Sequence, residues 1–378
     1  MKHLKQLILL LLIIFSLTGC YSSVSEEPIN DIVPEDKITQ EVQPSNQTEE
    51  NPSSESELPK GSNFEVHYID VGQADAALVI CDGNYMLIDG GNDEDSSLIY
   101  SYLTKQNVKK LHTIVCSHAH EDHVGGLPAA VHNFEFETVY APVRENDIDS
   151  YRSFKEKIIS KGKSITNPKP GDSFNFGCSV VEFLGPMYDT TDLNNTSLVL
   201  KITYGSTSFL FTGDAEREVE QDILNKGFDL SATVLKVGHH GGATSTTYPF
   251  LREVMPEYAI ISVGKNNQYH HPTEDVLSRL RDADVTVYRT DLNGDIIAKS
   301  DGKNVTITTK KNETPVPTVV PSDNTNSNGS SEYIGNLKSK KFHYPTCHSL
   351  PAEHNREYLS SREEAISKGY SSCGNCCP

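Results

Sequence analysis

The feature that most constrains this chain is a run of metal-binding side chains at residues 117–126. The run reads Ser-His-Ala-His-Glu-Asp-His-Val-Gly-Gly, so three imidazoles and two carboxylates fall within six residues. It directly follows residues 111–116, a short apolar segment typical of a buried strand. In an extended chain, His118 and His120 project to the same side, and the residues after them can serve a neighbouring point. Imidazole combined with carboxylate favours zinc, manganese or iron over calcium.

Hydrophobic periodicity predicts an α/β chain between residues 64 and 288. Strands are expected at 64–68, 76–80, 85–88, 111–116, 138–140, 173–176, 179–184, 197–204, 207–211, 233–237, 258–263 and 285–288. Helices are expected at 98–105, 124–132, 151–160, 216–226, 248–254 and 274–282. Two series of strands, each followed by helix–strand units, predict two mixed sheets packed face to face with helices outside.

The pattern His-x-His-x-Asp-His-x-Gly-Gly resembles the metallo-β-lactamase superfamily, and the resemblance covers about residues 64–300. It implies an αβ/βα four-layer sandwich with two divalent metal ions, zinc or manganese, at the edges of the sheets. The implied metal ligands are His118, His120, Asp122, His123, Asp214 and His239. His240 remains the alternative to His239. Asp122 would also orient the attacking hydroxide, and Asp89, before Gly90-Gly91, would brace the metal loop.

One ligand of the general superfamily pattern is missing. No histidine stands between His132 and Asp214, where that pattern has a third one. Asn195 lies near the expected place, so its carbonyl oxygen or a water would replace the imidazole and favour manganese. This departure is similar to the ComEC/Rec2-like branch, the metallo-hydrolase domain attached to the DNA-uptake channel of competent bacteria.

Two further motifs carry the same resemblance. Residues 67–75 (HYIDVGQAD) resemble the opening motif of that branch, and residues 261–264 with 271–273 (ISVG, HPT) resemble its closing motif. Asp70, Gln73 and Asp75 are expected to support the ligands. His271 is expected to steady a phosphate or to protonate a leaving oxygen. A loop histidine held by Pro272 is the alternative interpretation of His271.

The start of the chain resembles a bacterial lipoprotein signal peptide. A short basic segment precedes an apolar run at residues 7–15, and Leu17-Thr18-Gly19-Cys20 follows. The run is too short to span a bilayer, which needs about 20 residues. The resemblance implies a lipid on Cys20 and anchoring at the extracellular face of the cytoplasmic membrane. An ordinary signal peptide with a chance cysteine is the alternative, and residues 21–62 form an acidic tether.

The end of the chain is expected to hold a separate zinc-binding module at residues 332–378. A Pro/Ser/Asn-rich linker at 313–331 divides it from the hydrolase domain at 63–312. The pairs His343-x3-Cys347 and Cys373-x2-Cys376 have the spacing of a structural zinc site. The segment resembles the zinc module of the Ada DNA-repair protein, with His343 in place of a cysteine, which implies a module that contacts DNA. Outside the cytoplasm, disulfides among its cysteines, Cys377 included, are the alternative.

The net charge of the chain limits the ways in which such a protein can bind DNA. The chain has 33 Lys+Arg against 52 Asp+Glu, a net charge of −19, which argues against wrapping duplex DNA by charge neutralisation. Bound cations invert the local field, so a metal-dependent enzyme on a polyanion stays possible. The sequence therefore predicts a monomeric, membrane-anchored, metal-dependent phosphodiesterase or nuclease acting on DNA, without a nucleotide cofactor. The alternatives are a hydrolase of another small ester or phosphodiester and a non-catalytic DNA-binding lipoprotein.

Overall fold

The computed structural model describes residues 58–59, 61–142, 148–188, 190–311, 333–345, 347, 350–351 and 353–373. The predicted signal peptide with Cys20, nearly all of the tether, the 313–331 linker and Cys376 lie outside these described residues. Within them, no helix has both the length and the apolar character needed to cross a membrane.

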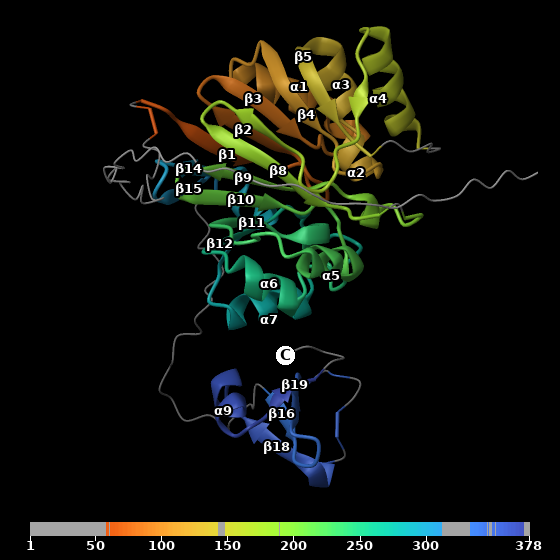
Figure 1. Cartoon of the computed structure of the whole chain (residues 1–378). Helices are drawn as coiled ribbons and strands as arrows, with labels where there is room; N and C mark the ends of the chain where they lie inside the picture. Colours follow the sequence, from red (N-terminus) through yellow and green to blue (C-terminus); the bar gives the residue numbers. More distant parts are fainter. Residues whose placement is uncertain are drawn as a thin grey trace, which may run out of the picture. The chain divides into compact units, whose positions relative to one another are not determined.

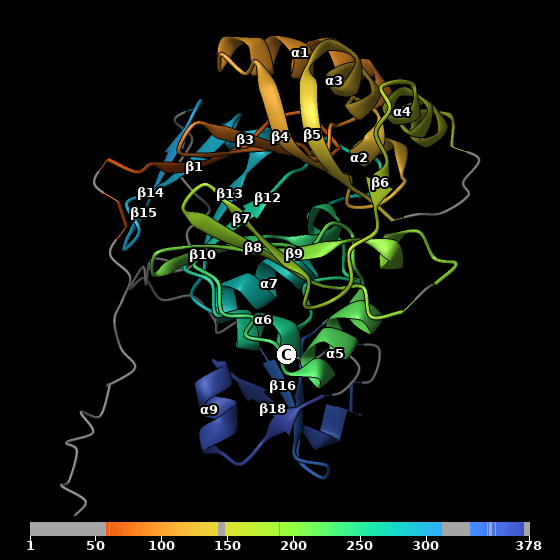
Figure 2. The ribbon, with the colours of Figure 1, turned by 45° about the horizontal axis from the view of Figure 1, so that its top comes forward.

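The first sheet has the strand order β15-β14-β1-β2-β3-β4-β5-β6. Its strands are β1 (Phe64–Tyr68), β2 (Ala77–Cys81), β3 (Asn84–Ile88), β4 (Lys110–Val115), β5 (Glu135–Tyr140), β6 (Ile165–Thr166), β14 (Ile296–Ser300) and β15 (Val305–Thr309). Strands β1 to β3 pair antiparallel, whereas β3 to β6 pair parallel. The expected hairpin of β2 and β3 is confirmed. The β14–β15 hairpin beside β1 was not predicted (Figure 2).

The second sheet has the order β13-β12-β11-β10-β9-β8-β7. Its strands are β7 (Ser173–Phe176), β8 (Ser179–Gly185), β9 (Val199–Tyr204), β10 (Thr207–Phe211), β11 (Val234–Lys236), β12 (Tyr258–Ile261) and β13 (Thr286–Arg289). Strands β7 to β10 are antiparallel, and β10 to β13 are parallel. Parallel neighbours need crossover helices, which lie on the outer face of this sheet.

Helices cover the outer faces of both sheets, which confirms the predicted sandwich (Figure 1). The first sheet carries α1 (Ser96–Lys105), α3 (Leu127–Asn133) and α4 (Asp149–Ser160), and α2 (Glu121–Val124) lies near the sheet edge; the second carries α5 (Arg217–Lys226), α6 (Tyr248–Val254) and α7 (Glu274–Asp282). Short turns are α8 (Thr290–Asn293), η1 (Asp93–Asp95), η2 (Asn194–Thr196) and η3 (Gly238–Gly241). Between the sheets, the alternating residues Phe64, Val66 and Tyr68 of β1 meet Leu200, Phe209 and Phe211 in one apolar core.

The helix predicted at 124–132 is wrong in one respect, because it is two helices. Helix α2 ends at Val124, and α3 begins at Leu127 with a proline in its first turn. Proline is tolerated there because the first-turn amides have no partner within the helix. The break falls at Gly125 and Gly126, because their backbone packs tightly against the loop after β3.

The C-terminal module has its own small sheet, with the order β18-β16-β17-β19. Its elements are β16 (Tyr333–Asn336), β17 (Lys341–His343), η4 (Glu353–Asn355), β18 (Arg356–Leu359), α9 (Arg362–Ser367) and β19 (Ser371–Ser372). Its core consists of Tyr333, Phe342, Tyr344, Leu359, Ala365 and Tyr370. So small a core rarely supplies enough free energy of folding without a metal or a disulfide.

Candidate metal centre

The metal loop follows β4 and is held against the loop after β3 by backbone-to-backbone packing. A Cβ atom on Gly125 would lie 2.2 Å from the Asn92 carbonyl carbon, and one on Gly126 would lie 2.2 Å from the Gly90 carbonyl oxygen. The Gly90 amide in turn donates to the His123 carbonyl at 2.7 Å. Gly90, Gly125 and Gly126 thus lie where two backbones touch, and this contact presents the histidines at the sheet edge.

A first cluster of possible metal ligands contains His118, His120 and Asp214. One donor atom from each lies within 4.8 Å of the others. Nε2 of His118 lies 3.0 Å from Nδ1 of His120 and 3.9 Å from Oδ2 of Asp214. His118 is fully buried, and Asp214 is 2% exposed. Asp214 follows β10 in a turn where its own amide donates to Oγ of Ser197 at 3.0 Å.

A second cluster contains Asp122, His123 and His240, again within 4.8 Å. Nε2 of His240 lies 3.2 Å from Oδ2 of Asp122 and 3.6 Å from Oδ2 of Asp214. Nε2 of His123 lies 3.3 Å from Oδ1 of Asp214. Asp214 thus touches both clusters, the arrangement expected of a carboxylate shared by two ions.

Hydrogen bonds fix which nitrogen of each imidazole faces the cluster. Nδ1 of His123 donates to Oδ2 of Asp89 at 3.0 Å, and Nδ1 of His240 donates to the Ser262 carbonyl at 3.0 Å. Both rings therefore point Nε2 toward Asp214, and this is the atom that each would offer to a bound cation. An outer partner of this kind orients most metal-ligating histidines in proteins. Asp89 also accepts from the amide and hydroxyl of Ser117, each at 2.7 Å.

The electrostatics of the centre fit cations. Oδ1 of Asp214 and Nε2 of His123 and of His240 are buried without a hydrogen bond in the described part of the chain. Despite burial, the carboxylates of Asp214 and Asp75 raise the pKa of His240 to about 10. Burial raises the pKa of the Asp122 carboxyl, but His123 and His240 outweigh this effect and lower the pKa to about 2. Buried carboxylates and the Nε2 atoms of two imidazoles that face them form a donor set suited to zinc or manganese.

Three predicted site residues, His239, Asn195 and Asp70, do not belong to either cluster. His239 belongs to neither group of donor atoms, although its Nε2 lies 3.8 Å from Oδ2 of Asp214; its Nδ1 faces Glu216 at 3.4 Å. The side-chain oxygen of Asn195 accepts from the Glu216 amide at 3.0 Å and has a second lone pair, so its replacement of the missing imidazole stays a prediction. Asp70 does not join the centre, since its carboxylate pairs with Lys311 at 3.3 Å.

Gln73 and His271 lie in the cleft that opens over the clusters. Oε1 of Gln73 accepts from the Gly264 amide at 3.1 Å, which ties the opening motif to the closing one. The cleft has a volume of about 590 Å³. It is lined by Gln73, Asn92, His120, Glu121, Asp122, Ile148, Asn194, Asp214, His239, His240, Gln268, Tyr269 and His271.

Sequence reasoning missed three residues that contact the centre. Glu216 orients His239, the Ser262 carbonyl orients His240, and Lys236 pairs with Asp75 behind His240 at 2.7 Å. Lys236 opens the Lys-Val-Gly-His-His motif, and a lysine at the end of a buried strand was the available signal.

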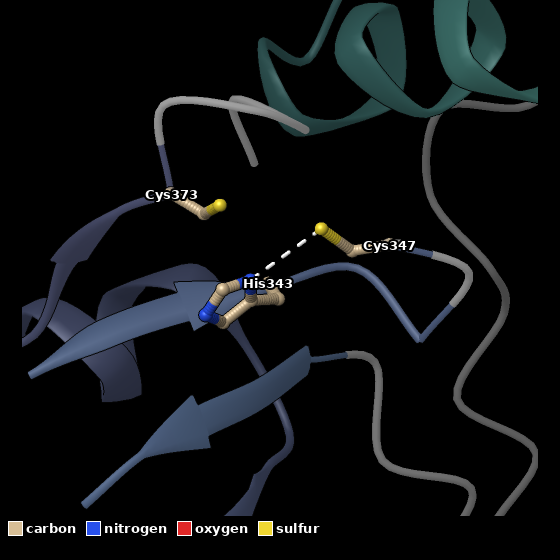
Figure 3. A group of neighbouring side chains, drawn as sticks. All are labelled: His343, Cys347 and Cys373. Atoms are coloured by element: carbon tan, nitrogen blue, oxygen red, sulfur yellow. Dashed lines mark hydrogen bonds between the residues drawn. The ribbon is translucent and has the colours of Figure 1, made fainter. Parts of the chain in front are cut away.

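A separate cluster lies in the C-terminal module. His343, Cys347 and Cys373 place donor atoms within 4.8 Å of one another, and Nδ1 of His343 is 3.5 Å from the Cys347 sulfur. Figure 3 shows His343 at the end of β17, with the two cysteine sulfur atoms turned toward the space beside it. The structure thus brings together these three predicted ligands, and the fourth, Cys376, lies outside the described residues.

Comparison with known families agrees with this geometry. The model of a family described as the metallo-beta-lactamase superfamily matches residues 69–265, more than half of the chain. The chain belongs to the metallo-beta-lactamase superfamily. The superfamily resemblance expected from the His-x-His-x-Asp-His motif is therefore confirmed.

Three relatives within this superfamily also match the chain. ComE operon protein 3 of Bacillus subtilis is 33% identical over 254 residues, which are 62% of this chain and 33% of that protein. Competence protein ComA of Neisseria gonorrhoeae is 32% identical over 227 residues, 60% and 30% of the two chains. Recombination protein 2 of Haemophilus influenzae is 30% identical over 239 residues, 62% and 28%. The chain spans about a third of the length of these relatives, and their names confirm the resemblance to the ComEC/Rec2-like branch.

Proposed function

We propose that this chain is a metal-dependent hydrolase that cleaves phosphodiester bonds in DNA. The observation that carries the proposal is Asp214, whose two carboxylate oxygens face two clusters of imidazoles and carboxylates at the floor of an open cleft. Relatives named for competence and recombination support DNA as the substrate.

Two sets of side chains, which share Asp214, would each hold one cation. His118, His120 and Asp214 would hold one ion, and Asp122, His123, His240 and Asp214 the other. Two divalent ions would supply Lewis acidity and a more acidic water, which the side chains lack. Asp122 is also 29% exposed and lines the cleft, so its carboxylate is placed to orient a water at the substrate.

His271 and Tyr269 would contact the substrate from the loop after β12. Burial, together with nearby His239 and His240, lowers the pKa of His271 to about 4, so the imidazole is neutral at pH 7. A neutral ring would steady a phosphate oxygen through a single hydrogen bond. Tyr269 is 57% exposed, and its ring centre lies 5.8 Å from that of His271. An exposed aromatic ring beside a phosphate site suits stacking by a nucleobase.

A second candidate is a hydrolase of a small phosphodiester. The cleft volume of about 590 Å³ lies within the range of pockets that enclose small molecules, roughly 300–1,000 Å³. Its lining includes the carboxylate of Glu121, which repels a long polyanion. We give priority to DNA as the substrate because two of the relatives are named for competence and for recombination.

Two proposals concern the ends of the chain. The sequence before Cys20 supports lipid anchoring at the extracellular face of the membrane. The cluster of His343, Cys347 and Cys373, in a module with few core residues, supports one structural zinc completed by Cys376 and a role near DNA.

The deciding experiment is cleavage of single- and double-stranded DNA by the full chain with Mn²⁺ or Zn²⁺. Asp122→Ala and a chelator are expected to abolish cleavage. Asp70→Ala is the matched control, because it also removes one carboxylate, but from a residue of the opening motif that pairs with Lys311 outside the centre. Turnover of a small aryl phosphodiester without DNA cleavage would move the assignment to the second candidate. No turnover with two ions bound would leave a DNA-binding lipoprotein.

A further inference from the structure

A buried ion pair joins the two sheets directly behind the second cluster. Lys236, the last residue of β11, is 3% exposed, and its ammonium lies 2.7 Å from Oδ2 of Asp75. The same ammonium donates to the Val237 carbonyl at 3.0 Å. Asp75, in the loop between β1 and β2, is 5% exposed. Because either charge would be costly if buried without its partner, each group holds the other in place.

Asp75 also contacts the imidazoles of the metal centre. Its Oδ1 lies 3.2 Å from Nδ1 of His240, and its Oδ2 lies 4.0 Å from Nδ1 of His123. Its backbone amide donates to the Asp122 carbonyl at 3.0 Å, and its carbonyl accepts from the Gly91 amide at 2.8 Å. Asp75 therefore touches the metal loop of one sheet and the His240 turn of the other.

The His240 turn needs such a support. His239 and His240 both have left-handed backbone angles, with φ of 50° and 52°. Non-glycine residues adopt this conformation at a cost and keep it only where surrounding contacts impose it. The Ser262 carbonyl and the Asp75 carboxylate are the groups that face Nδ1 of His240.

The positive charge of Lys236 would repel a cation bound at the second cluster. A lysine at this place must therefore offset that repulsion by another contribution to the site. Pairing with Lys236 occupies Oδ2 of Asp75 and leaves Oδ1 directed at His240. The lysine thus holds Oδ1 of Asp75 at 3.2 Å from Nδ1 of His240, beside the Ser262 carbonyl that accepts the imidazole proton, and prevents the carboxylate from turning toward the ions.

We propose that Asp75 and Lys236 are positioning residues that set the metal affinity of the second cluster by fixing the His240 ring with Nε2 toward Asp122 and Asp214. This inference rests on the proposed function, because it requires cations at that cluster. Outer partners of ligating histidines typically change metal affinity about 10–100-fold. Since the Ser262 carbonyl still orients His240, we expect an effect near the lower end, about tenfold.

The decisive variant is the double substitution Lys236→Met with Asp75→Leu. It removes one positive and one negative charge together, so the net field at the ions is nearly unchanged and the remaining effect reports orientation. Replacing a buried ion pair by apolar residues of similar volume is often neutral for stability, so this variant should fold. Lys236→Met with Asp75→Asn is the conservative variant, because the amide oxygen of asparagine can take the place of Oδ1 beside Nδ1 of His240.

The measurements are Mn²⁺ and Co²⁺ affinity by competition with a chelating dye, the Co²⁺ absorption spectrum, and unfolding by denaturant in chelator. Lys201→Met is the matched control: Lys201 is 6% exposed and pairs with Asp229 at 2.9 Å. We expect the Met/Leu variant to bind one of two ions about tenfold more weakly with an altered spectrum. The Met/Asn variant should recover part of the loss, and Lys201→Met should bind both ions normally.

Each outcome separates this inference from the proposed function. Unchanged affinity and spectrum in a folded Met/Leu variant would overturn the positioning role and leave the pair purely structural. If the Met/Leu variant unfolds, Lys236→Met with Asp75→Ala takes its place, since this variant also lacks the carboxylate beside His240 and its normal binding of both ions would overturn the role. If the unmodified chain fails to bind a second ion, the proposed two-ion centre itself is wrong, whatever the variants show.

Discussion

Replacing Asp89 by Asn would remove one charge from the metal centre while leaving the shape of the side chain unchanged. The carboxylate is 2% exposed and accepts three hydrogen bonds, from the amide and hydroxyl of Ser117 and from Nδ1 of His123. An asparagine can keep Oδ1 toward the Ser117 amide, and the hydroxyl of Ser117 can turn to accept from the new NH₂ group. The contact with His123 is the one that cannot be kept, because two donors would then face each other.

The size of the effect follows from that single contact. A hydrogen bond to a charged group contributes about 1.5–3 kcal/mol. His123 can avoid the clash by moving its proton from Nδ1 to Nε2, but Nε2 is the atom that faces Asp214 at 3.3 Å. Either way the cation would meet a ligand that is misoriented or protonated. At about 1.4 kcal/mol per tenfold, the affinity of the second cluster should fall roughly 10–100-fold.

A dye-competition titration of Asp89→Asn with Mn²⁺ or Zn²⁺ measures this directly. The expected result is one ion bound as before and one bound more weakly, with activity restored at high metal concentration. Asp82→Asn is the matched control, because Asp82 also accepts backbone bonds, from Asn63 and Cys178, but lies at the surface. Two ions bound with unchanged affinity in Asp89→Asn would refute the reasoning about His123.

Four further outcomes follow from the same geometry. Gly126→Ala should cost about 1–3 kcal/mol in denaturant unfolding, because its Cβ would lie 2.2 Å from the Gly90 carbonyl oxygen; unchanged stability would contradict the close packing. Tyr269→Ala should raise KM for single-stranded DNA by about 5–100-fold with little change in kcat, since stacking contributes roughly 1–3 kcal/mol per base; an unchanged KM argues against stacking. Metal analysis should find one ion lost in His240→Ala and two retained in His239→Ala, and the reverse pattern would exchange the two assignments. In chelator, neighbouring carboxylates raise the pKa of His240 from 6.5 to about 10 against the effect of burial. The free energy of unfolding that this shift contributes should be complete below pH 6.5 and lost as the pH rises toward 10. A free energy of unfolding that stays flat over that range would contradict this prediction.

The parts of the site that are local in sequence could be predicted. His118, His120, Asp122 and His123 stand within six residues after one strand, so no knowledge of the tertiary fold is needed to bring them together. Asp214, three residues after the end of β10, was identified through the resemblance to the metallo-β-lactamase superfamily and not through its spacing. Most strands and helices also followed from periodicity, since their buried faces repeat with the expected spacing.

The parts that depend on distant contacts could not be predicted in this way. His239 and His240 are neighbours, and only the backbone angles of their turn decide which ring enters the second cluster. The pairing of Lys236 with Asp75 joins two sheets across more than 150 residues of sequence. Asp70 was expected near the ligands because it precedes them in a motif, yet its carboxylate is directed to Lys311.

Two fold errors have different origins. Residues 305–309 (VTITT) alternate β-branched apolar and polar side chains, and residues 296–300 (IIAKS) alternate in burial, so a local strand signal was present and was overlooked. Gly125 and Gly126 interrupt a continuous helical pattern because Asn92 and Gly90 touch their backbone. In this second case a tertiary contact overrides the local signal.

The most direct test of the account is a crystal structure of the full chain grown with Mn²⁺ and recorded at the manganese absorption edge. The account predicts two anomalous peaks separated by Asp214, one beside His118 and His120 and the other beside Asp122, His123 and His240. A single peak, or peaks away from Asp214, would contradict the two-ion centre on which the proposed hydrolase depends.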